Sequence, residues 1–372
     1  MTLHPDRDVC LLHSDVELHG NWLDRLRRCA YQVDEAGTVT PFSNNAAICS
    51  YPRFCEDNPV RAGQESATLD QLFSRVNTEQ WVEIPVTTGF CWYIKRRCIE
   101  RVGYFDTQRF PHPDSQVIDF CLRAAEQGFK HLLCGDTFVY HQGDSSDALE
   151  HQRLPYQIMP SLRIHHPHFE QQLALYVSAD QARLLRRRVD LVRLIQSPKP
   201  RLLFVTHRLG GGTERHVQEL AYLLKPQCEV LILRPVADDR LALTWYGQAE
   251  EFALFFTIPA ESDALIRLLQ AVAIARVHVH HLIGHHPLIA QLSTKLGIPY
   301  DFTLHDYYSI CPQFNLTLPD GRYCGEPDIG GCNACLQKRP SVWRLDIVAW
   351  RSLFRQLLEG AERVFGPSQD VI

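Results

Sequence analysis

The sequence contains no long uninterrupted run of apolar residues. None of its runs approaches the roughly 20 residues that a membrane-spanning helix requires. The N-terminus also lacks a basic region followed by a long apolar stretch, which is the pattern of a secretory signal peptide. These two absences predict a cytoplasmic protein without a transmembrane segment, with peripheral association at the inner membrane face as the alternative location.

Neither sign of charge dominates the composition. The 38 Lys and Arg residues and 43 Asp and Glu residues leave a formal net charge of −5 and a pI near 6.4. This balance predicts no general attraction to nucleic acid. Internal repeats and low-complexity tracts are also absent. The 45% hydrophobic and 10% aromatic content is typical of a globular protein, and 372 residues suffice for two domains with separate cores.

Cysteine, in contrast, is plentiful, with 13 residues. Most are single residues in apolar surroundings, which indicates buried thiols in a reducing compartment. Four others follow the spacing Cys311-x12-Cys324-x7-Cys332-x2-Cys335. This spacing, which includes a Cys-x-x-Cys pair, is typical of a structural Zn²⁺ site. The alternatives are unliganded thiols or disulfides, and a cytoplasmic location disfavours disulfides.

Short apolar runs alternate with amphipathic segments in the first part of the chain. We expect strands at 9–12, 37–47, 90–94 and 130–141, and helices at 21–32 and 117–127. From 144 to 199 the pattern weakens, prolines recur, and a helix at 179–195 leads into the boundary signal "QSPKP". The expected domains are therefore 1–145 and 200–372, joined by a linker at 146–199.

The helix in this linker carries four arginines. We interpret it as a charge-rich, solvent-exposed connector that packs on one domain through its apolar face. Contact with a membrane surface or an anionic ligand is the alternative. The arginines are Arg183, Arg186, Arg187 and Arg188.

Strands and helices alternate again from Arg201 onward. The runs "RLLFVTH", "CEVLILR", "VHVHHL" and "YDFTLHD" have the composition of buried strands, and another strand begins at 363–365. Helices are expected after the glycine-rich turn and at 262–275 and 286–296. This alternation predicts a parallel, doubly wound sheet.

Two strand ends in the first part carry residues that could ligate a cation. Asp15 follows the first strand, and a carboxylate there could bind a divalent cation that bridges a diphosphate. His141 ends the strand at 130–141 and could be a second ligand. The alternatives are a helix-capping role for Asp15 and an ordinary hydrogen bond for His141.

The turn "GGGTE" joins the strand at 201 to the following helix. Its glycines, Gly210, Gly211 and Gly212, could let backbone N–H groups approach an anion at the helix N-terminus. The turn fits neither Gly-x-Gly-x-x-Gly nor a P-loop, and a simple tight turn is the alternative. We expect Thr213 to cap the helix and Glu214 to lie in its first turn.

The blocks "LLHSDVELHGNWLDRL", "GTVTPFSNNAAICSYP", "TTGFCWYIKRRCIERVGYFD" and "DFCLRAAEQGFKHLLCGDTFVYHQG" together resemble family-2, GT-A-type glycosyltransferases, particularly the rhamnosyltransferase-like branch, over residues 7–145. The resemblance implies that Asp15 faces a Mg²⁺ or Mn²⁺ ion and that His141 is a late metal or diphosphate contact. It also implies that Thr88, Gly89 and Phe90 line the acceptor side.

This sequence departs from that family in two ways. The family's domain begins with a nucleotide-binding βαβ segment, and we expect this chain to lack it. The family also has an acidic pair before "DFCLRA" that includes the general base, whereas this chain has Gln116 and Val117. Neither side chain can accept a proton at neutral pH. Asp114 and Asp119 are nearby candidates for the base, but they do not occupy the matching position.

Residues 201–372 resemble the N-terminal half of a family-4, GT-B-type glycosyltransferase, through "FVTHRLGGGTERHVQELA", "LHDYYSICP", "DGRYCGEPDIGGCNAC" and "ERVFGPSQDV". The resemblance implies that the turn Gly210–Gly212 faces the donor diphosphate and acceptor, and that His305 and Asp306 line the same cleft. It places the main nucleotide-sugar site in a C-terminal half that we expect this chain to lack.

The expected fold is therefore α/β, with a truncated GT-A domain, a helical linker and a Rossmann-like GT-B half-domain. The expected function is transfer of a sugar from a nucleotide sugar to a saccharide in polysaccharide or O-antigen synthesis, by a fragment of a tandem enzyme. The alternative is a catalytically impaired glycan-binding subunit that needs a second polypeptide to supply the missing half-domains.

Overall fold

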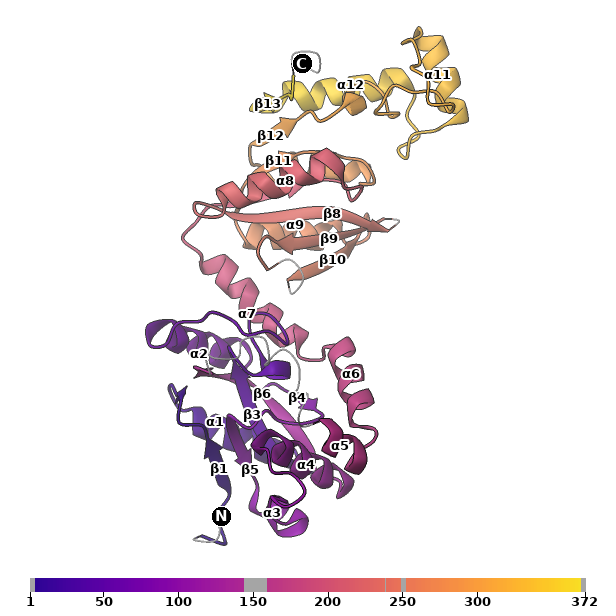
Figure 1. Cartoon of the computed structure of the whole chain (residues 1–372). Coiled ribbons are helices and arrows are strands. Elements are labelled where there is room, and N and C mark those ends of the chain that lie inside the picture. The colour runs from indigo at the N-terminus through magenta and orange to yellow at the C-terminus, as the bar shows by residue number, and fades with distance from the viewer. Residues whose placement is uncertain (1–3, 144–158, 238, 249–251, 369–372) are drawn as a thin grey trace. The chain divides into compact units, whose positions relative to one another are not determined.

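The computed structural model describes residues 4–143, 159–237, 239–248 and 252–368 (Figure 1). The chain forms two compact units, Met1–Val192 and Arg193–Ile372, here called unit 1 and unit 2. The division lies inside helix α7 (Arg183–Gln196). Each unit has its own β-sheet, so the chain is mixed α/β.

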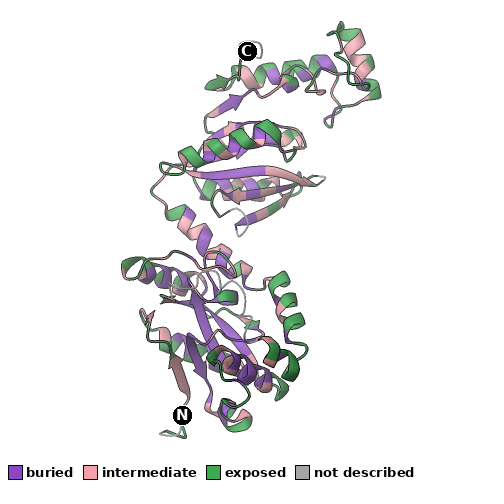
Figure 2. Ribbon diagram, in the orientation of Figure 1, coloured by how far each residue is buried: buried purple, intermediate pink, exposed green. Residues whose placement is uncertain are grey.

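The sheet of unit 1 combines parallel and antiparallel pairs. Its order is β1 (Val9–Leu12), β5 (Cys91–Ile94), β3 (Ala36–Ser43), β6 (Lys130–His141) and β2 (Val16–Glu17), and β4 (Trp81–Ile84) also pairs with β6. Strands β3 and β6 are parallel, and every residue of β3 is buried. Figure 2 shows that buried residues concentrate in these strands, as expected for a sheet covered on both faces.

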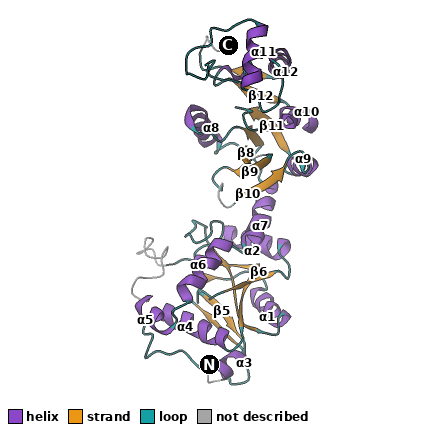
Figure 3. Cartoon of the chain, turned by 90° about the vertical axis from the view of Figure 1, so that its right-hand side faces the viewer, coloured by secondary structure: helices purple, strands orange, loops and turns teal. Residues whose placement is uncertain are grey.

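Helices cover both faces of this sheet, with α1 on one side and α4 and α6 on the other (Figure 3). Helix α1 buries Leu26, Cys29 and Ala30, which recur at helical spacing and pack toward the core. The remaining elements preceding the linker are η1 (Ala47–Cys49), α2 (Gln64–Val76), α3 (Arg96–Val102) and α4 (Pro113–Glu126), with α1 spanning Trp22–Gln32.

The predicted linker is more regular than the sequence suggested. Its residues 146–158 lie outside the described residues, but α5 (Met159–His165) and α6 (Phe169–Ala179) precede α7. The expected single helix at 179–195 is interrupted because Asp180 adopts a left-handed conformation, with φ 42°, and ends α6. Leu162, Phe169 and Val189 are buried in the unit 1 core. The apolar face of α7 thus packs on unit 1 as expected, but Arg186 is buried and pairs with Asp180, so not all of its arginines are solvent-exposed.

The sheet of unit 2 contains the expected parallel part and an antiparallel extension. Its order is β10 (Ala253–Thr257), β9 (Arg240–Trp245), β8 (Glu229–Ala237), β7 (Arg201–Val205), β11 (Ile274–Val279), β12 (Tyr300–Thr303) and β13 (Arg363–Phe365). Strands β8, β7, β11, β12 and β13 are parallel to one another. Strands β9 and β10 pair antiparallel with their neighbours, and the sequence analysis did not predict them.

This strand order creates a topological switch point. From β7 the chain passes to β8 on one side, and it later returns to β11 on the other side of β7. In open α/β sheets, ligands bind in the crevice outside the carboxyl ends of the strands at such a point. The carboxyl ends of β7 and β11 therefore mark where a site is expected.

Helix α8 (Gly211–Leu224) covers one face of this sheet, and α9 (Ser262–Ala271) and α10 (Leu292–Leu296) cover the other (Figure 3). The N-cap of α8 is Gly210, so the prediction that Thr213 caps this helix was wrong, whereas Glu214 does lie in the first turn. The other elements are η2 (Pro287–Gln291), η3 (Tyr307–Ser309), α11 (Ile329–Lys338) and α12 (Ile347–Glu359). Among all described helices, none combines the length and apolar character required to cross a bilayer.

Candidate functional site

Histidines gather at the carboxyl edge of the unit 2 sheet. His207 follows β7, His280 and His281 follow β11, and His305 follows β12. The parallel pairing of β11 with both β7 and β12 brings these three strand ends together. The rings of His207 and His281 accordingly lie 4.8 Å apart between centroids. The cluster therefore lies at the topological switch point.

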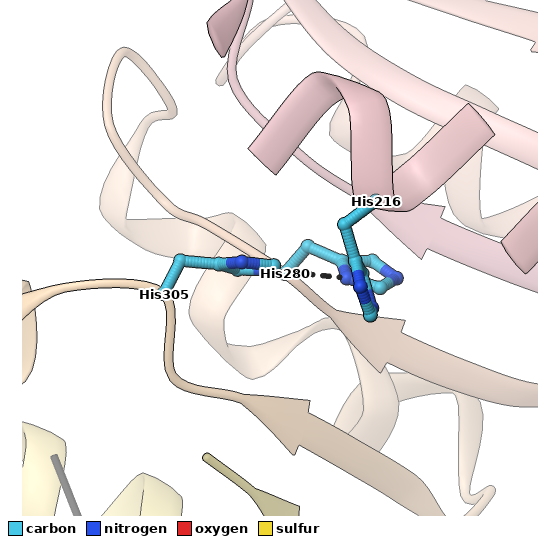
Figure 4. A group of neighbouring side chains, drawn as sticks. All are labelled: His216, His280 and His305. Carbon is cyan, nitrogen blue, oxygen red and sulfur yellow. Dashed lines mark hydrogen bonds between the residues drawn. The ribbon is translucent and has the colours of Figure 1, made fainter. Parts of the chain in front are cut away.

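Two of these side chains, His280 and His305, converge with a third histidine, His216 (Figure 4). His216, from the second turn of α8, has its ring centroid 5.5 Å from that of His280 and 5.1 Å from that of His305. The Nδ1 atom of His280 lies 3.4 Å from Nε2 of His305. One ring nitrogen from each residue lies within 4.8 Å of the others. This group could hold a transition-metal ion or bind the hydroxyl groups of a sugar.

Burial keeps the inner histidines of this cluster neutral. It lowers the pKa of His305 to about 4, and the neighbouring His216 and His281 act in the same direction. Burial also lowers the pKa of His280 well below its usual value. His280 is only 1% exposed, and among the described residues its Nε2 atom has no hydrogen-bond partner. A buried polar atom of this kind is costly unless a ligand satisfies it.

Asp306 positions His281. Its carboxylate accepts a hydrogen bond from the backbone N–H of Tyr308, at 2.9 Å, and lies 3.2 Å from Nε2 of His281. The N–H of Ile283 donates to Nδ1 of His281, so the proton of a neutral His281 lies on Nε2, facing Asp306. Burial acts to raise the pKa of Asp306, but the hydrogen bond from His281 and the bond from Tyr308 keep that pKa below its usual value.

The glycine turn leaves the start of α8 open. Gly210 and Gly211 have φ values of 73° and 76°, and no side chain caps the helix. A Cβ atom added to either glycine would meet nothing within 4 Å. An anion could therefore approach the backbone N–H groups here. Thr213 is buried, and the Glu214 carboxylate accepts a 2.7 Å hydrogen bond from Arg234, which favours a structural role for Glu214.

A second group of possible ligands lies in unit 1. Val16 of β2 pairs with His141 of β6, which brings the preceding turn beside the end of β6. The Asp15 Oδ2 atom lies 3.4 Å from Nε2 of His141, and His13 completes a group whose ligand atoms lie within 4.8 Å of one another. The structure thus brings together both residues that the sequence analysis selected as cation ligands and adds His13.

The hydrogen bonds around His141 suit a metal ligand. Its Nδ1 atom lies 2.7 Å from the carbonyl oxygen of Asn45, which can only accept, so Nδ1 carries the proton and Nε2 keeps its lone pair. Two imidazoles and one carboxylate form a nitrogen-rich donor set. Mg²⁺ prefers oxygen ligands, whereas Mn²⁺ and later transition metals also accept imidazole. The residues therefore fit Mn²⁺ better than Mg²⁺.

The predicted acceptor segment adjoins this group. Phe90 is buried and stacks on His141, with centroids 5.3 Å apart. The hydroxyl group of Thr88 is buried. Gly89 has φ 78°, and a Cβ added there would lie 3.1 Å from Val117. Val117, one of the two residues at the position of the missing acidic pair, therefore contacts the turn that the resemblance assigns to the acceptor.

The two alternative base candidates lie in different surroundings. Asp119 is buried, and its carboxylate accepts a 2.8 Å bond from Arg123 and lies 3.0 Å from Nε2 of His166. These contacts favour a structural role for Asp119. Asp114 is exposed in the first turn of α4 and lies 3.7 Å from His112. Neither residue belongs to the group formed by His13, Asp15 and His141.

Sequence reasoning missed most of the histidine cluster. It interpreted "VHVHHL" as a buried strand and selected only His305 and Asp306 from this edge, whereas the structure adds His207, His216 and His280. A usable signal was present, because a histidine follows each of the strands β7, β11 and β12. The four cysteines that the sequence analysis selected all line one cavity.

Comparison with known proteins bears on unit 2. Residues 210–372 match the model of Glycosyltransferase Family 4, and this match supports a glycosyltransferase. The glycine turn, His216, His280 and His305 all lie within the matched residues. The mixed α/β architecture with two sheets fits a glycosyltransferase-like fold. The comparison with curated proteins gave no match.

Proposed function

We propose that this protein transfers a sugar from a nucleotide-activated donor to a hydroxyl group of a saccharide, in polysaccharide or O-antigen synthesis. The observation that carries the proposal is the arrangement at the switch point of unit 2. There an uncapped glycine turn and neutral histidines lie at one sheet edge, within the part of the chain that resembles family 4. Anion-binding N–H groups beside hydroxyl-binding imidazoles suit a phosphorylated sugar and its acceptor.

In unit 2, the start of α8 binds the diphosphate of the donor. The backbone N–H groups after Gly210 and the positive end of the helix dipole stabilise its negative charge. His280 and His305 are neutral, so each can donate one hydrogen bond and accept another. With a pKa of about 4, His305 is a weak base at neutral pH. We therefore assign these imidazoles to orienting sugar hydroxyls rather than to removing a proton.

Unit 1 is proposed to be a GT-A-type domain that binds Mn²⁺. His13, Asp15 and His141 would hold the ion. When bound, the cation would neutralise charge on a leaving diphosphate. Phe90 and Gly89 would border the acceptor beside His141 and Val117. Because Val117 cannot accept a proton, transfer in unit 1 is expected to be slowed by about 10²- to 10⁴-fold relative to a domain with an acidic base.

That missing base also supports the alternative function. In that case the protein binds an acceptor glycan but depends on a second polypeptide for donor binding. If the protein instead transfers sugar, as proposed first, the chain is part of a tandem enzyme whose two units act on successive sugars. Both cases predict binding of a saccharide, and only the first predicts turnover by this chain.

The test is an assay of the full chain with a panel of sugar nucleotides and oligosaccharide acceptors, following both nucleoside diphosphate release and the mass of the glycan. We expect transfer that persists in the presence of a chelator and that falls at least about 10-fold in His305→Ala, equivalent to about 1.4 kcal/mol. Arg215→Ala is the matched control, because Arg215 is exposed and lies beside His216 on the same helix. It should retain full activity.

Transfer that appears only after a second polypeptide is added would favour the glycan-binding alternative. Saccharide binding and transfer that are unaffected in His305→Ala would overturn the assignment of the unit 2 cleft. A Mn²⁺-dependent part of the transfer activity that is lost in Asp15→Asn but kept in His305→Ala would be assigned to unit 1.

A further inference from the structure

The segment around α11 has very little core of its own. In Figure 1, α11 and the loop before it project away from the unit 2 sheet. From Thr317 to Gly331, all of which the structure describes, no residue is buried. Leu316 and Leu336 are the buried apolar side chains at its two ends. Segments with so little buried apolar surface generally need a covalent or metal cross-link to hold one conformation.

Four cysteines from three parts of this segment surround one cavity. Cys311 follows η3, Cys324 lies in the loop, and Cys332 and Cys335 lie one turn apart on the same face of α11. All four line a cavity of about 80 Å³ and are half-buried free thiols. We call it the four-cysteine cavity. The fold thus brings together thiols that are distant in the sequence. This observation is independent of the cysteine spacing and agrees with it.

Hydrogen-bond donors lie near two of these sulfur atoms, although the Cys332 thiol also donates to the carbonyl oxygen of Pro327, at 3.4 Å. The backbone N–H of Gln313 donates to Sγ of Cys311 at 3.4 Å. The Nη2 atom of Arg351, from α12, lies 3.9 Å from Sγ of Cys332. A hydrogen-bond donor and a cation near sulfur both stabilise its deprotonated form. Asp328 caps α11 by accepting from the N–H of Gly331, which fixes the helix start that carries Cys332.

We infer that the four-cysteine cavity binds one structural Zn²⁺ ion through four thiolates. Binding forms four Zn–S bonds and releases the thiol protons to solvent, with no change of oxidation state. The four Sγ atoms are not among the groups whose ligand atoms already lie within 4.8 Å of one another. With Zn–S bonds of about 2.3 Å, ligation requires the sulfur atoms to move inward, and the cavity provides the space for this movement.

This inference is independent of the proposed function, because the site would stabilise the segment whether or not the chain transfers sugar. The cross-link joins the loop after β12 to the start of α11, so the ion would hold α11 against that loop. The histidine cluster and the group at Asp15 are the competing places for zinc in the described structure. An experiment must therefore separate thiolate ligation from imidazole ligation.

The test measures zinc per chain in the purified full-length protein after dialysis, by elemental mass spectrometry. We expect one zinc per chain in the wild type and in Cys228→Ser, which removes a half-buried thiol of unit 2 outside the cavity. The double variant Cys332→Ser/Cys335→Ser should lose this zinc completely. Removal of zinc from the wild type should increase hydrogen exchange in peptides covering 311–338 while leaving those of β7 and β11 unchanged.

Substitution with Co²⁺ gives a readout that does not depend on a variant folding. A thiolate site should show an intense sulfur-to-cobalt charge-transfer band and the visible spectrum of tetrahedral Co²⁺. Zinc retained in the double variant, or a cobalt spectrum without the charge-transfer band, would overturn the inference. So would a folded wild-type protein that binds no zinc, or a disulfide within the cluster detected by mass after alkylation without reduction.

Discussion

Nε2 of His141 lies 3.4 Å from the Asp15 carboxylate while Nδ1 of the same ring donates to the carbonyl of Asn45. The second contact fixes both the tautomer and the direction of the ring. Gly143 also donates its N–H to Asp15 Oδ2, at 3.1 Å, which orients the carboxylate. Such supporting hydrogen bonds typically change metal affinity by about 10- to 100-fold. Asp15 and His141 are therefore already oriented toward a shared ligand.

The first prediction is that unit 1 binds Mn²⁺ and does so more tightly than Mg²⁺, because two of the three donors are imidazole nitrogens. Loss of free Mn²⁺ signal in electron paramagnetic resonance titrations measures binding. Asp15→Asn should weaken it at least about 10-fold. Asp114→Asn removes an exposed carboxylate of unit 1 outside the group and should bind normally. Equal affinities in the two variants would contradict the assignment.

Long-range pairing explains what the sequence could and could not predict. The limits of β6 agree with the predicted strand at 130–141, because apolar residues such as Leu132, Leu133, Phe138 and Val139 recur along it. Asp15 and His141 could each be selected, but their proximity follows from the pairing of β2 with β6. Helices α5 and α6 were missed because their apolar residues face the unit 1 core only after the chain has folded. The histidine cluster likewise depends on the order of β7, β11 and β12.

The second prediction concerns the backbone of the glycine turn. Gly210 and Gly211 have positive φ values, a conformation that costs an L-residue roughly 1–2 kcal/mol. Gly210→Ala and Gly211→Ala should therefore lower the free energy of unfolding of unit 2 by about this amount and weaken diphosphate binding. Gly212 is the control, because it lies in α8 without a positive φ and has open space around its Cα.

Gly212→Ala should be neutral or stabilising by roughly 0.5–1 kcal/mol, as expected for glycine replaced in a helix. Chemical denaturation of the three variants measures the stability difference, and isothermal titration with a nucleoside diphosphate measures binding. If all three substitutions change stability and binding alike, the positive φ values of Gly210 and Gly211 determine neither property.

The third prediction concerns a buried ion pair in unit 1. The Nη2 atom of Arg25, on α1, lies 2.8 and 2.7 Å from the two carboxylate oxygens of Asp70, on α2, and both side chains are almost fully buried. Asp70→Ala leaves the guanidinium buried without its anion, so unit 1 should lose about 3–5 kcal/mol of stability. Calorimetry measures this loss and also identifies the unfolding transition of unit 1, since only that transition should shift.

Glu170→Ala is the control for this measurement, because it also lies in unit 1. It breaks the ion pair with Arg163, but the two side chains are 45% and 62% exposed. Exposed pairs contribute about 0–1 kcal/mol, so the change should be small. A similar loss in both variants would mean that burial of the Arg25–Asp70 pair has no special energetic role.

The fourth prediction is a pH dependence caused by His131. This side chain is buried, its Nδ1 atom lies 2.7 Å from the Thr38 hydroxyl, and its Nε2 atom lies 2.8 Å from the carbonyl oxygen of Cys121. The carbonyl oxygen of Cys121 can only accept, so Nε2 carries a proton, and in the neutral ring Nδ1 accepts from the Thr38 hydroxyl. Burial lowers its pKa from 6.5 to about 4, and the bond to Cys121 opposes the shift only in part.

Because the folded pKa is the lower one, the unfolded state binds more protons between pH 6.5 and about 4. The stability due to this residue is therefore complete above pH 6.5, falls as the pH decreases toward 4, and changes no further below that. The full loss is about 3 kcal/mol for a shift of this size. His131→Gln cannot titrate, so its unit 1 transition should lack this contribution.

Carboxylates also titrate in this range, so the informative quantity is the difference between wild type and His131→Gln, measured by calorimetry at pH 7, 5.5 and 4. His112→Gln is the control, because His112 is exposed on the same unit. Its loss should leave the pH dependence of unit 1 stability unchanged. Parallel pH profiles for wild type and His131→Gln would show that His131 can accept a proton without opening the core. The Thr38 hydroxyl would then have rotated to accept from a protonated Nδ1, so that the network joining Thr38, His131 and Cys121 tolerates an imidazolium.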